Sequence, residues 1–109
     1  MKPPIVVIDD DIDVYGSAAE AERDLEPWSI REGRMRIYDG DGRRIRAVIA
    51  KKFLAETVKL EMGDGEDEPN ELRRALVQFL SPREKLPEDT YREGSMDQLA
   101  ERALRWKTR

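Results

Sequence analysis

The sequence of 109 residues contains no cysteine and no histidine. Without cysteine the chain can form no disulfide framework and has no thiol nucleophile, and without either residue it lacks the usual ligand set of a zinc site. A Ser–His or Cys–His catalytic pair is excluded for the same reason. We therefore expect no catalytic residue, no metal site and no cofactor.

Long hydrophobic runs are also missing near the start of the chain. The first residues lead into an apolar run of only four, Ile5-Val6-Val7-Ile8, which is too short for a signal peptide or a membrane span. We expect a cytoplasmic protein that makes no contact with a membrane.

Charged residues make up 40% of the chain and hydrophobic residues 39%, so the core must be small and must use the few aromatic residues well. A chain of this length suits one domain, here residues 1–109. The net charge of −4 disfavours general nucleic-acid binding but still permits a local basic patch.

Residues 33–50 carry the clearest pattern in the sequence. Two alternating runs flank Asp39-Gly40-Asp41-Gly42, which predicts a β-hairpin. A two-residue loop would mix charged and apolar side chains on both faces of the hairpin. A three-residue loop, Gly40-Asp41-Gly42 with Gly42 at positive φ, sets Ile37 opposite Ile45 and leaves one face apolar. We therefore predict the three-residue loop, whose apolar face holds Met35, Ile37, Ile45, Ala47 and Ile49.

The rest of the chain predicts short strands at 5–8 and 12–15 and a third after the hairpin at 56–62. Residues 51–55 stay open between a strand connection and a short helix over 48–54. Capping boxes at Ser17 and Ser95 open two helices, over 18–25 and from Met96, and Pro27 should close the first. A third helix starts at Pro69 and should end at Pro82. The predicted fold is α+β, with an antiparallel sheet of three to five strands and three helices packed mainly on one face.

Two patterns near the start of the chain resemble known motifs. Six residues match positions 1, 3, 5, 7, 9 and 12 of an EF-hand loop: Asp9, Asp11, Asp13, Tyr15, Ser17 and Glu20. Val14 stands where that loop needs glycine, and a strand-like run precedes it where the motif needs a helix, so we predict no calcium site. The opening VVIDDD resembles response-regulator receiver domains, but the alternating βα units of that family are missing.

The second face of the hairpin is basic and partly aromatic, with Arg34, Arg36, Tyr38, Arg44 and Arg46. Such a strip resembles sheet surfaces that stack a base and neutralise phosphates. The competing interpretation, which we favour, is that its arginines pair with nearby acids such as Glu61, Asp39 and Asp41.

A further resemblance covers about a third of the chain. Asp13-Val14-Tyr15, Ser17, Ala21-Glu22, Leu25-Glu26-Pro27, Tyr38-Asp39 and Gly42-Arg43 together resemble a pattern in small uncharacterised bacterial proteins. That resemblance implies no activity and no site residues.

Acidic residues are abundant, but none lies in an apolar stretch that would shift its pKa toward acid–base work, so we expect no enzyme. The leading hypothesis is a non-enzymatic protein-binding module, most concretely an immunity-like inhibitor of a basic partner, by analogy with proteins that neutralise toxins. Its binding residues would be Asp64, Glu66, Asp67 and Glu68, with the acids at 9–13 also steering association. The alternative is an anion or single-stranded nucleic-acid binder that uses the basic strip. The identity of the partner and the oligomeric state stay open.

Overall fold

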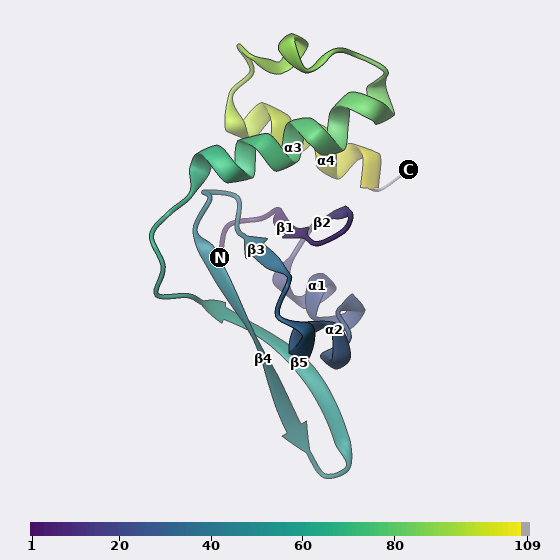
Figure 1. Cartoon of the computed structure of the whole chain (residues 1–109), viewed down its shortest axis with the longest axis vertical. Coiled ribbons are helices and arrows are strands. Elements are labelled where there is room, and N and C mark those ends of the chain that lie inside the picture. Colours follow the sequence, from purple (N-terminus) through teal and green to yellow (C-terminus); the bar gives the residue numbers. More distant parts are fainter. Residues whose placement is uncertain (108–109) are drawn as a thin grey trace.

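Five strands form one antiparallel sheet in the order β2-β1-β3-β4-β5 (Figure 1). The strands are β1 Ile5–Ile8, β2 Ile12–Tyr15, β3 Arg36–Tyr38, β4 Arg44–Lys52 and β5 Ala55–Met62. The computed structural model describes residues 1–107 of the chain. The predicted α+β class with an antiparallel sheet is confirmed.

Helices cover both faces of this sheet. Ile5 and Val7 of β1 lie in one core cluster with Ala21 of α1 (Ala18–Asp24), and α2 (Pro27–Glu32) packs near β4 and β5 on the same side. Val6 lies in a second cluster with α3 (Pro69–Glu84) and α4 (Met96–Lys107). The expectation that the helices pack mainly on one face is wrong. They divide between two because β1 is apolar on both faces, and each face has to be covered.

The helix starts follow the predicted caps. The Ser17 hydroxyl accepts a hydrogen bond from the Glu20 backbone N–H at 3.1 Å. Ser95 and Gln98 bond reciprocally, at 3.1 and 2.9 Å. Pro27, however, does not simply close the first helix. It is the first residue of α2, a short helix that the sequence analysis missed, because proline is as well suited to begin a helix as to end one.

Helix α3 buries the five residues that its periodicity predicted: Leu72, Ala75, Leu76, Phe79 and Leu80. It does not end at Pro82, as expected, but continues to Glu84 and closes at Lys85, whose φ is 57°. Pro82 is tolerated because it lies in the last turn of the helix, so it removes a single hydrogen bond near the helix end. A 3₁₀ turn, η1 (Glu88–Tyr91), then leads to α4.

The hairpin between β3 and β4 has the predicted register. Ile37 lies opposite Ile45, the Gly42 N–H donates to the Asp39 carbonyl at 3.0 Å, and Gly42 has a φ of 81°. The three-residue loop is therefore confirmed.

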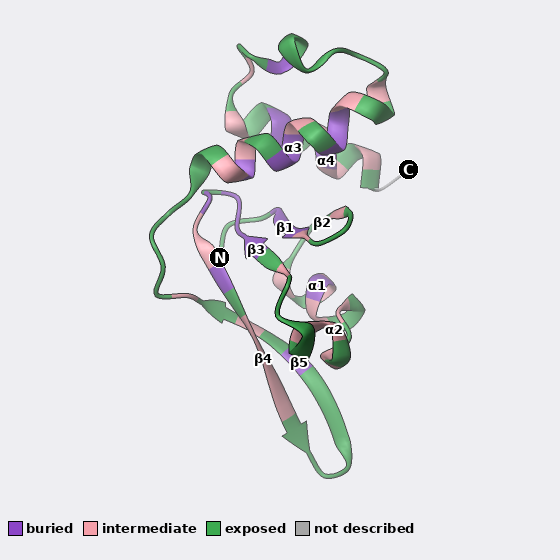
Figure 2. Cartoon of the chain, viewed as in Figure 1, coloured by how far each residue is buried: buried purple, intermediate pink, exposed green. Residues whose placement is uncertain are grey.

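The second hairpin, β4–β5, settles residues 51–55 as strand and turn. Lys52 pairs with Ala55, so Phe53 and Leu54 form a two-residue turn. We call residues 49–58, the distal part of this hairpin, the arm. The arm extends along the long axis of the molecule beyond the helices, and its end is exposed (Figures 1 and 2).

Candidate functional site

A cleft lies beside β4, and we call it the central cleft. It has a volume of about 460 Å³. It forms because β3 is short: the chain pairs with β4 at Ile37 and Tyr38, whereas Met35, which was expected on the apolar face of the hairpin, precedes β3 and does not pair with β4. The lining residues are Ile30, Gly33, Met35, Ile37, Arg44, Ile45, Arg46, Ala47, Gly63, Asp64 and Gly65.

This cleft combines an apolar floor with a charged margin. Ile37 and Ile45 are almost completely buried beneath it. Arg46 donates to Glu61 through Nε at 2.7 Å and also lies 3.7 Å from Asp64. The hydrogen bond to Glu61 raises the pKa of Arg46 above its ordinary value, so this charge is permanent. The cleft therefore joins residues of the two predicted sites, the basic strip and the acidic loop.

The four acids predicted for partner binding do not share one environment. Glu68 accepts from the Tyr38 hydroxyl at 2.6 Å and lies 3.7 Å from Arg44, while its N–H donates to the Gly42 carbonyl at 2.7 Å. Burial, followed by the bond to Glu68, raises the pKa of Tyr38. Glu68 thus fastens the start of α3 to the sheet, and its carboxylate is already engaged.

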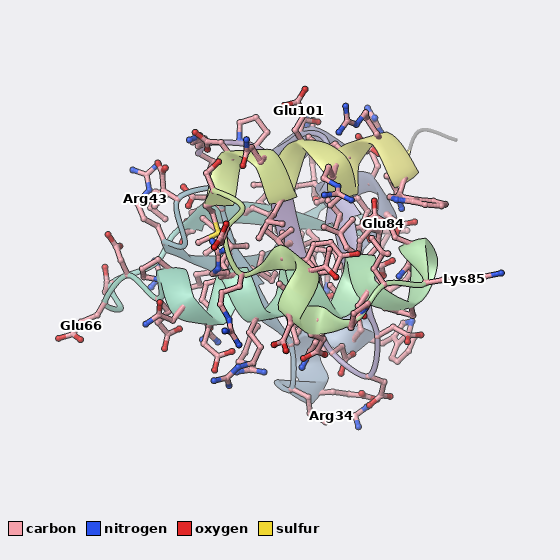
Figure 3. All side chains as sticks on the ribbon, turned by 90° about the horizontal axis from the view of Figure 1, so that it is seen from above. Arg34, Arg43, Glu66, Glu84, Lys85 and Glu101 are labelled. Carbon is pink, nitrogen blue, oxygen red and sulfur yellow. The ribbon has the colours of Figure 1, made fainter. Side chains whose placement is uncertain are left out.

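The other three acids of the loop are exposed. The Asp64 side chain is 95% exposed and makes only a distant ion pair with Arg46. Glu66 points away from the body of the protein (Figure 3). Asp67 makes a Coulombic interaction with Arg43 that helps to raise the pKa of that arginine. We call Asp64, Glu66 and Asp67 the acidic loop. Asp64 lies at the edge of the central cleft, and Glu66 and Asp67 follow it within three residues.

Every arginine of the basic strip has an acidic neighbour. Arg34 donates to Glu32 at 2.7 Å and Arg36 to Glu71 at 3.4 Å, in addition to the pairs of Arg44 and Arg46 already described. Arg46 pairs with Glu61, as the favoured interpretation predicted; Asp39 and Asp41 pair instead with Arg43.

The strip is also not an open sheet surface. Tyr38 has no exposed area and lies in the core cluster of α3 and α4. The expectation of an exposed aromatic residue there is wrong, because α3 and α4 cover that part of the sheet.

Sequence reasoning missed a buried carboxylate in the first hairpin loop. The Asp39 side chain has no exposed area, and its oxygens accept from the N–H groups of Asp41 and Arg43, each at 3.0 Å, and from Arg43 Nε at 2.8 Å. Burial by itself would raise the pKa of Asp39, but these donors outweigh it and hold the pKa below its ordinary value. An Asp two residues before a loop N–H was the available signal, since such side chains often bond to their own turn.

A second carboxylate, Glu84, joins the end of α3 to η1 and α4 (Figure 3). It accepts from the Tyr91 hydroxyl at 2.7 Å, from Trp106 Nε1 at 3.1 Å and from the Arg102 guanidinium. Burial would raise the pKa of Glu84, and these three donors lower it overall. This cluster holds the two helices together and leaves no oxygen of Glu84 without a donor.

The acids of the EF-hand-like pattern lie on a tight strand–strand turn, on β2 and on α1. Glu20 accepts from the Gly16 N–H at 3.2 Å, so it has a structural role at the helix start. Among residues 1–107 no group of three or more acidic side chains is placed to hold a metal ion. That no calcium binds here stays a prediction, for which titration calorimetry is the measurement.

No helix among the described residues has the length and the apolar character needed to cross a membrane. Comparison with protein-family models, with curated proteins and with solved structures finds no match to this chain, so the central cleft and the acidic loop are interpreted from their own chemistry.

Proposed function

We propose that this chain is a non-enzymatic protein-binding module whose partner docks at the central cleft and the acidic loop. One observation carries the proposal: a cleft of about 460 Å³ has an apolar floor, and the exposed carboxylate of Asp64, the first acid of the acidic loop, lies at its margin. Protein interfaces commonly combine an apolar centre with a polar rim in this way.

The ionisable groups that line the cleft support binding rather than catalysis. They are Arg44, Arg46 and Asp64, and the two arginines pair with carboxylates. Arginine stays protonated in proteins, so it can position an anion but cannot exchange protons at neutral pH.

In its most concrete form the proposal is an immunity-like inhibitor of a basic partner. The acidic loop offers three exposed carboxylates on a chain with a net charge of −4, which would attract a cationic surface and speed its association. The apolar floor would then supply the area that holds the complex together. The inhibitory role itself is an analogy with small acidic immunity proteins.

The alternative proposal is an anion or single-stranded nucleic-acid binder that uses the arginines of the basic strip. A phosphate would have to compete with the carboxylates that already pair with Arg36, Arg44 and Arg46. The buried Tyr38 ring is not accessible for stacking on a base. The paired arginines and the buried Tyr38 ring both favour the first proposal.

The test uses a triple variant of the acidic loop, Asp64→Asn, Glu66→Gln and Asp67→Asn. The matched control, Glu88→Gln, Asp89→Asn and Glu93→Gln, removes three exposed acids near η1, so both variants change the net charge from −4 to −1. The partner is first captured from source-cell lysate on the wild-type chain and identified by mass spectrometry. Association rates of all three chains are then measured over a range of salt concentrations.

We expect a basic partner, a lower association rate for the loop variant and a flatter salt dependence, with the control close to wild type. Equal rates and salt slopes for the loop variant and wild type would remove the acidic loop from the interface. Salt-dependent retention of the wild-type chain on a polyanion resin would instead support the alternative.

A further inference from the structure

Strand β5 is an edge of the sheet, and part of its outer side is open. It pairs with β4 alone. The outward N–H of Leu60 is occupied by the Glu22 carboxylate at 2.7 Å. Backbone N–H and C=O groups alternate in direction along a strand, so those of Glu56 and Val58 point away from β4, as those of Leu60 do. Within residues 1–107 the outward backbone groups of Glu56 and Val58 have no hydrogen-bond partner, so the open edge is the five-residue segment 55–59.

The turn next to this open edge carries two large apolar side chains in solvent. Phe53 is 89% exposed and Leu54 is 99% exposed. The whole tip of the β4–β5 hairpin is exposed (Figure 2). Phe53 also has a φ of 58°, in the left-handed region that a bulky residue rarely adopts. Glycine or asparagine would fit this turn at lower cost, and such outliers are common where a surface has a binding role.

A cleft runs along the same edge, between β5 and the junction of α1 and α2, and we call it the edge cleft. It has a volume of about 430 Å³, and its apolar lining includes Leu25, Pro27 and Val58. Charged side chains line much of the rest of it, namely Glu22, Arg23, Glu26, Glu56 and Lys59, so the edge cleft is mixed in character and leaves space beside β5.

We propose that two copies of this chain pair through the open edges of β5, antiparallel across a two-fold axis at Thr57, with Leu54 of each copy beside Leu60 of the other. The proposal joins two features of each copy: the unpaired edge of β5 and the exposed apolar tip beside it. It does not depend on the proposed function, because the acidic loop and the central cleft take no part in it.

The pairing register follows from which residues would face each other. Thr57 is the centre of the open segment, and an axis there sets Thr57 opposite itself, Glu56 opposite Val58 and Ala55 opposite Lys59. No like charges meet, and a Thr–Thr pair is favourable across antiparallel strands. An axis at Glu56 would oppose two carboxylates directly. An axis at Val58 would need the N–H of Leu60, which Glu22 already occupies.

The same register carries Leu54 past the edge cleft, whose β5 residues are Glu56, Thr57, Val58 and Lys59, and sets it beside Leu60 of the second copy. With the axis at Thr57, position 54 lies opposite Leu60 of the second copy, on the face where Val58 and Leu60 pack toward α1. An axis of this kind uses the same surface on both copies, so it closes at two chains and forms no open filament.

Cysteine cross-linking tests the register directly, because the natural chain has no cysteine. In the proposed pair the two Thr57 Cα atoms would be about 4.5 Å apart, the spacing of a non-hydrogen-bonded antiparallel pair. A disulfide spans this distance, so Thr57→Cys should form a covalent dimer on mild oxidation. The matched control is Lys59→Cys, on the same face of β5, where the two cysteines would be about 13 Å apart and should not link.

Sedimentation velocity on the natural chain, from low micromolar to near-millimolar concentration, should show the mass rising from 12.6 kDa toward twice that value. Glu56→Pro should abolish the rise, because proline is tolerated at an outward edge position but cannot donate to a second strand. Leu54→Asp should also abolish it, while Glu56→Gln should dimerise like the natural chain. Melting curves establish that each variant is folded.

A natural chain that stays at 12.6 kDa throughout would overturn the proposal. Cross-linking of Lys59→Cys as readily as Thr57→Cys would also overturn it, as would dimerisation of Glu56→Pro. Masses above the dimer would exclude the two-fold arrangement.

Discussion

Asp39 offers a sharp test of how this fold is stabilised, because its carboxylate is fully buried and has a matched exposed neighbour in the same loop. Asp39→Ala removes the acceptor for the N–H groups of Asp41 and Arg43 and for the Arg43 guanidinium. Breaking a buried charged contact of this kind costs about 3–5 kcal/mol. Asp39→Asn keeps one acceptor oxygen and loses the charge, which should cost about 2 kcal/mol.

The assay is thermal unfolding at pH 7. For a chain of this size, each kcal/mol lowers the midpoint by about 4 °C, so we expect a decrease of about 12–20 °C for Asp39→Ala and about 8 °C for Asp39→Asn. The control is Asp41→Asn, whose side chain is 48% exposed and makes only longer ion pairs with Lys2 and Arg43. It should cost less than about 1 kcal/mol.

The pH dependence provides a second readout. The folded-state pKa of Asp39 lies below the ordinary value of 3.8, so the carboxylate stabilises the fold above that value and loses this effect as pH falls through the folded pKa. The gap in melting temperature between wild type and Asp39→Asn should therefore be full at pH 7 and should close at low pH, below 3.8. Equal midpoints for Asp39→Asn and Asp41→Asn at pH 7, or a gap that is constant down to the lowest pH at which both fold, would refute this reasoning.

Three further predictions follow from the sheet and the core. Ile37→Asp should unfold the chain, because it buries an unpaired charge opposite Ile45, whereas the exposed Arg36→Asp should cost less than about 1 kcal/mol; equal melting temperatures would contradict the observed register. Gly42→Ala should destabilise more than Gly33→Ala, since both have positive φ but only at Gly42 would a Cβ lie 2.6 Å from the Pro69 Cα; chemical denaturation measures the difference, and equal costs would count against this close approach. All three tyrosines of the chain have raised pKa values, and burial is the main cause; the pKa of Tyr91 is raised to about 12. Absorbance at alkaline pH should therefore show no tyrosine that ionises at the ordinary pKa near 10. Because unfolded tyrosines ionise near the ordinary value, stability should be full below it and fall as pH rises toward the folded values, and ionisation of one tyrosine near pH 10 in the folded chain would contradict the burial.

Local sequence patterns determined most of the secondary structure of this protein. Alternation and the Asp-Gly-Asp-Gly loop specify the first hairpin and its register, because a one-residue slip would move every apolar side chain to the other face. The capping residues Ser17 and Ser95 determine where two helices start. The ion pair between Arg46 and Glu61 was also foreseeable, since it lies across neighbouring strands.

The positions of prolines were harder to interpret from the sequence. Pro27 begins a helix and Pro82 lies inside the last turn of one, whereas both were expected to close helices. Proline excludes a hydrogen bond at its own nitrogen but does not state whether the chain before or after it is helical. Only the packing of α2 beside β4 and β5 and of α3 over β1 decides these two cases.

The candidate site depended on tertiary structure to a much greater degree. The sequence determined that Tyr38 lies on the opposite face of the hairpin from Ile37, but only the docking of α3 and α4 determined that this face is buried. The contacts Tyr38–Glu68 and Arg36–Glu71 join residues 30 and 35 positions apart. The central cleft likewise exists because β3 begins only at Arg36, which leaves the β3 side of β4 without a partner strand beyond Ile45. The loop at 63–65 forms part of the wall of this cleft. Strand pairing and capping are specified by neighbouring residues, whereas burial and clefts depend on which distant elements pack together, and no local pattern encodes that choice.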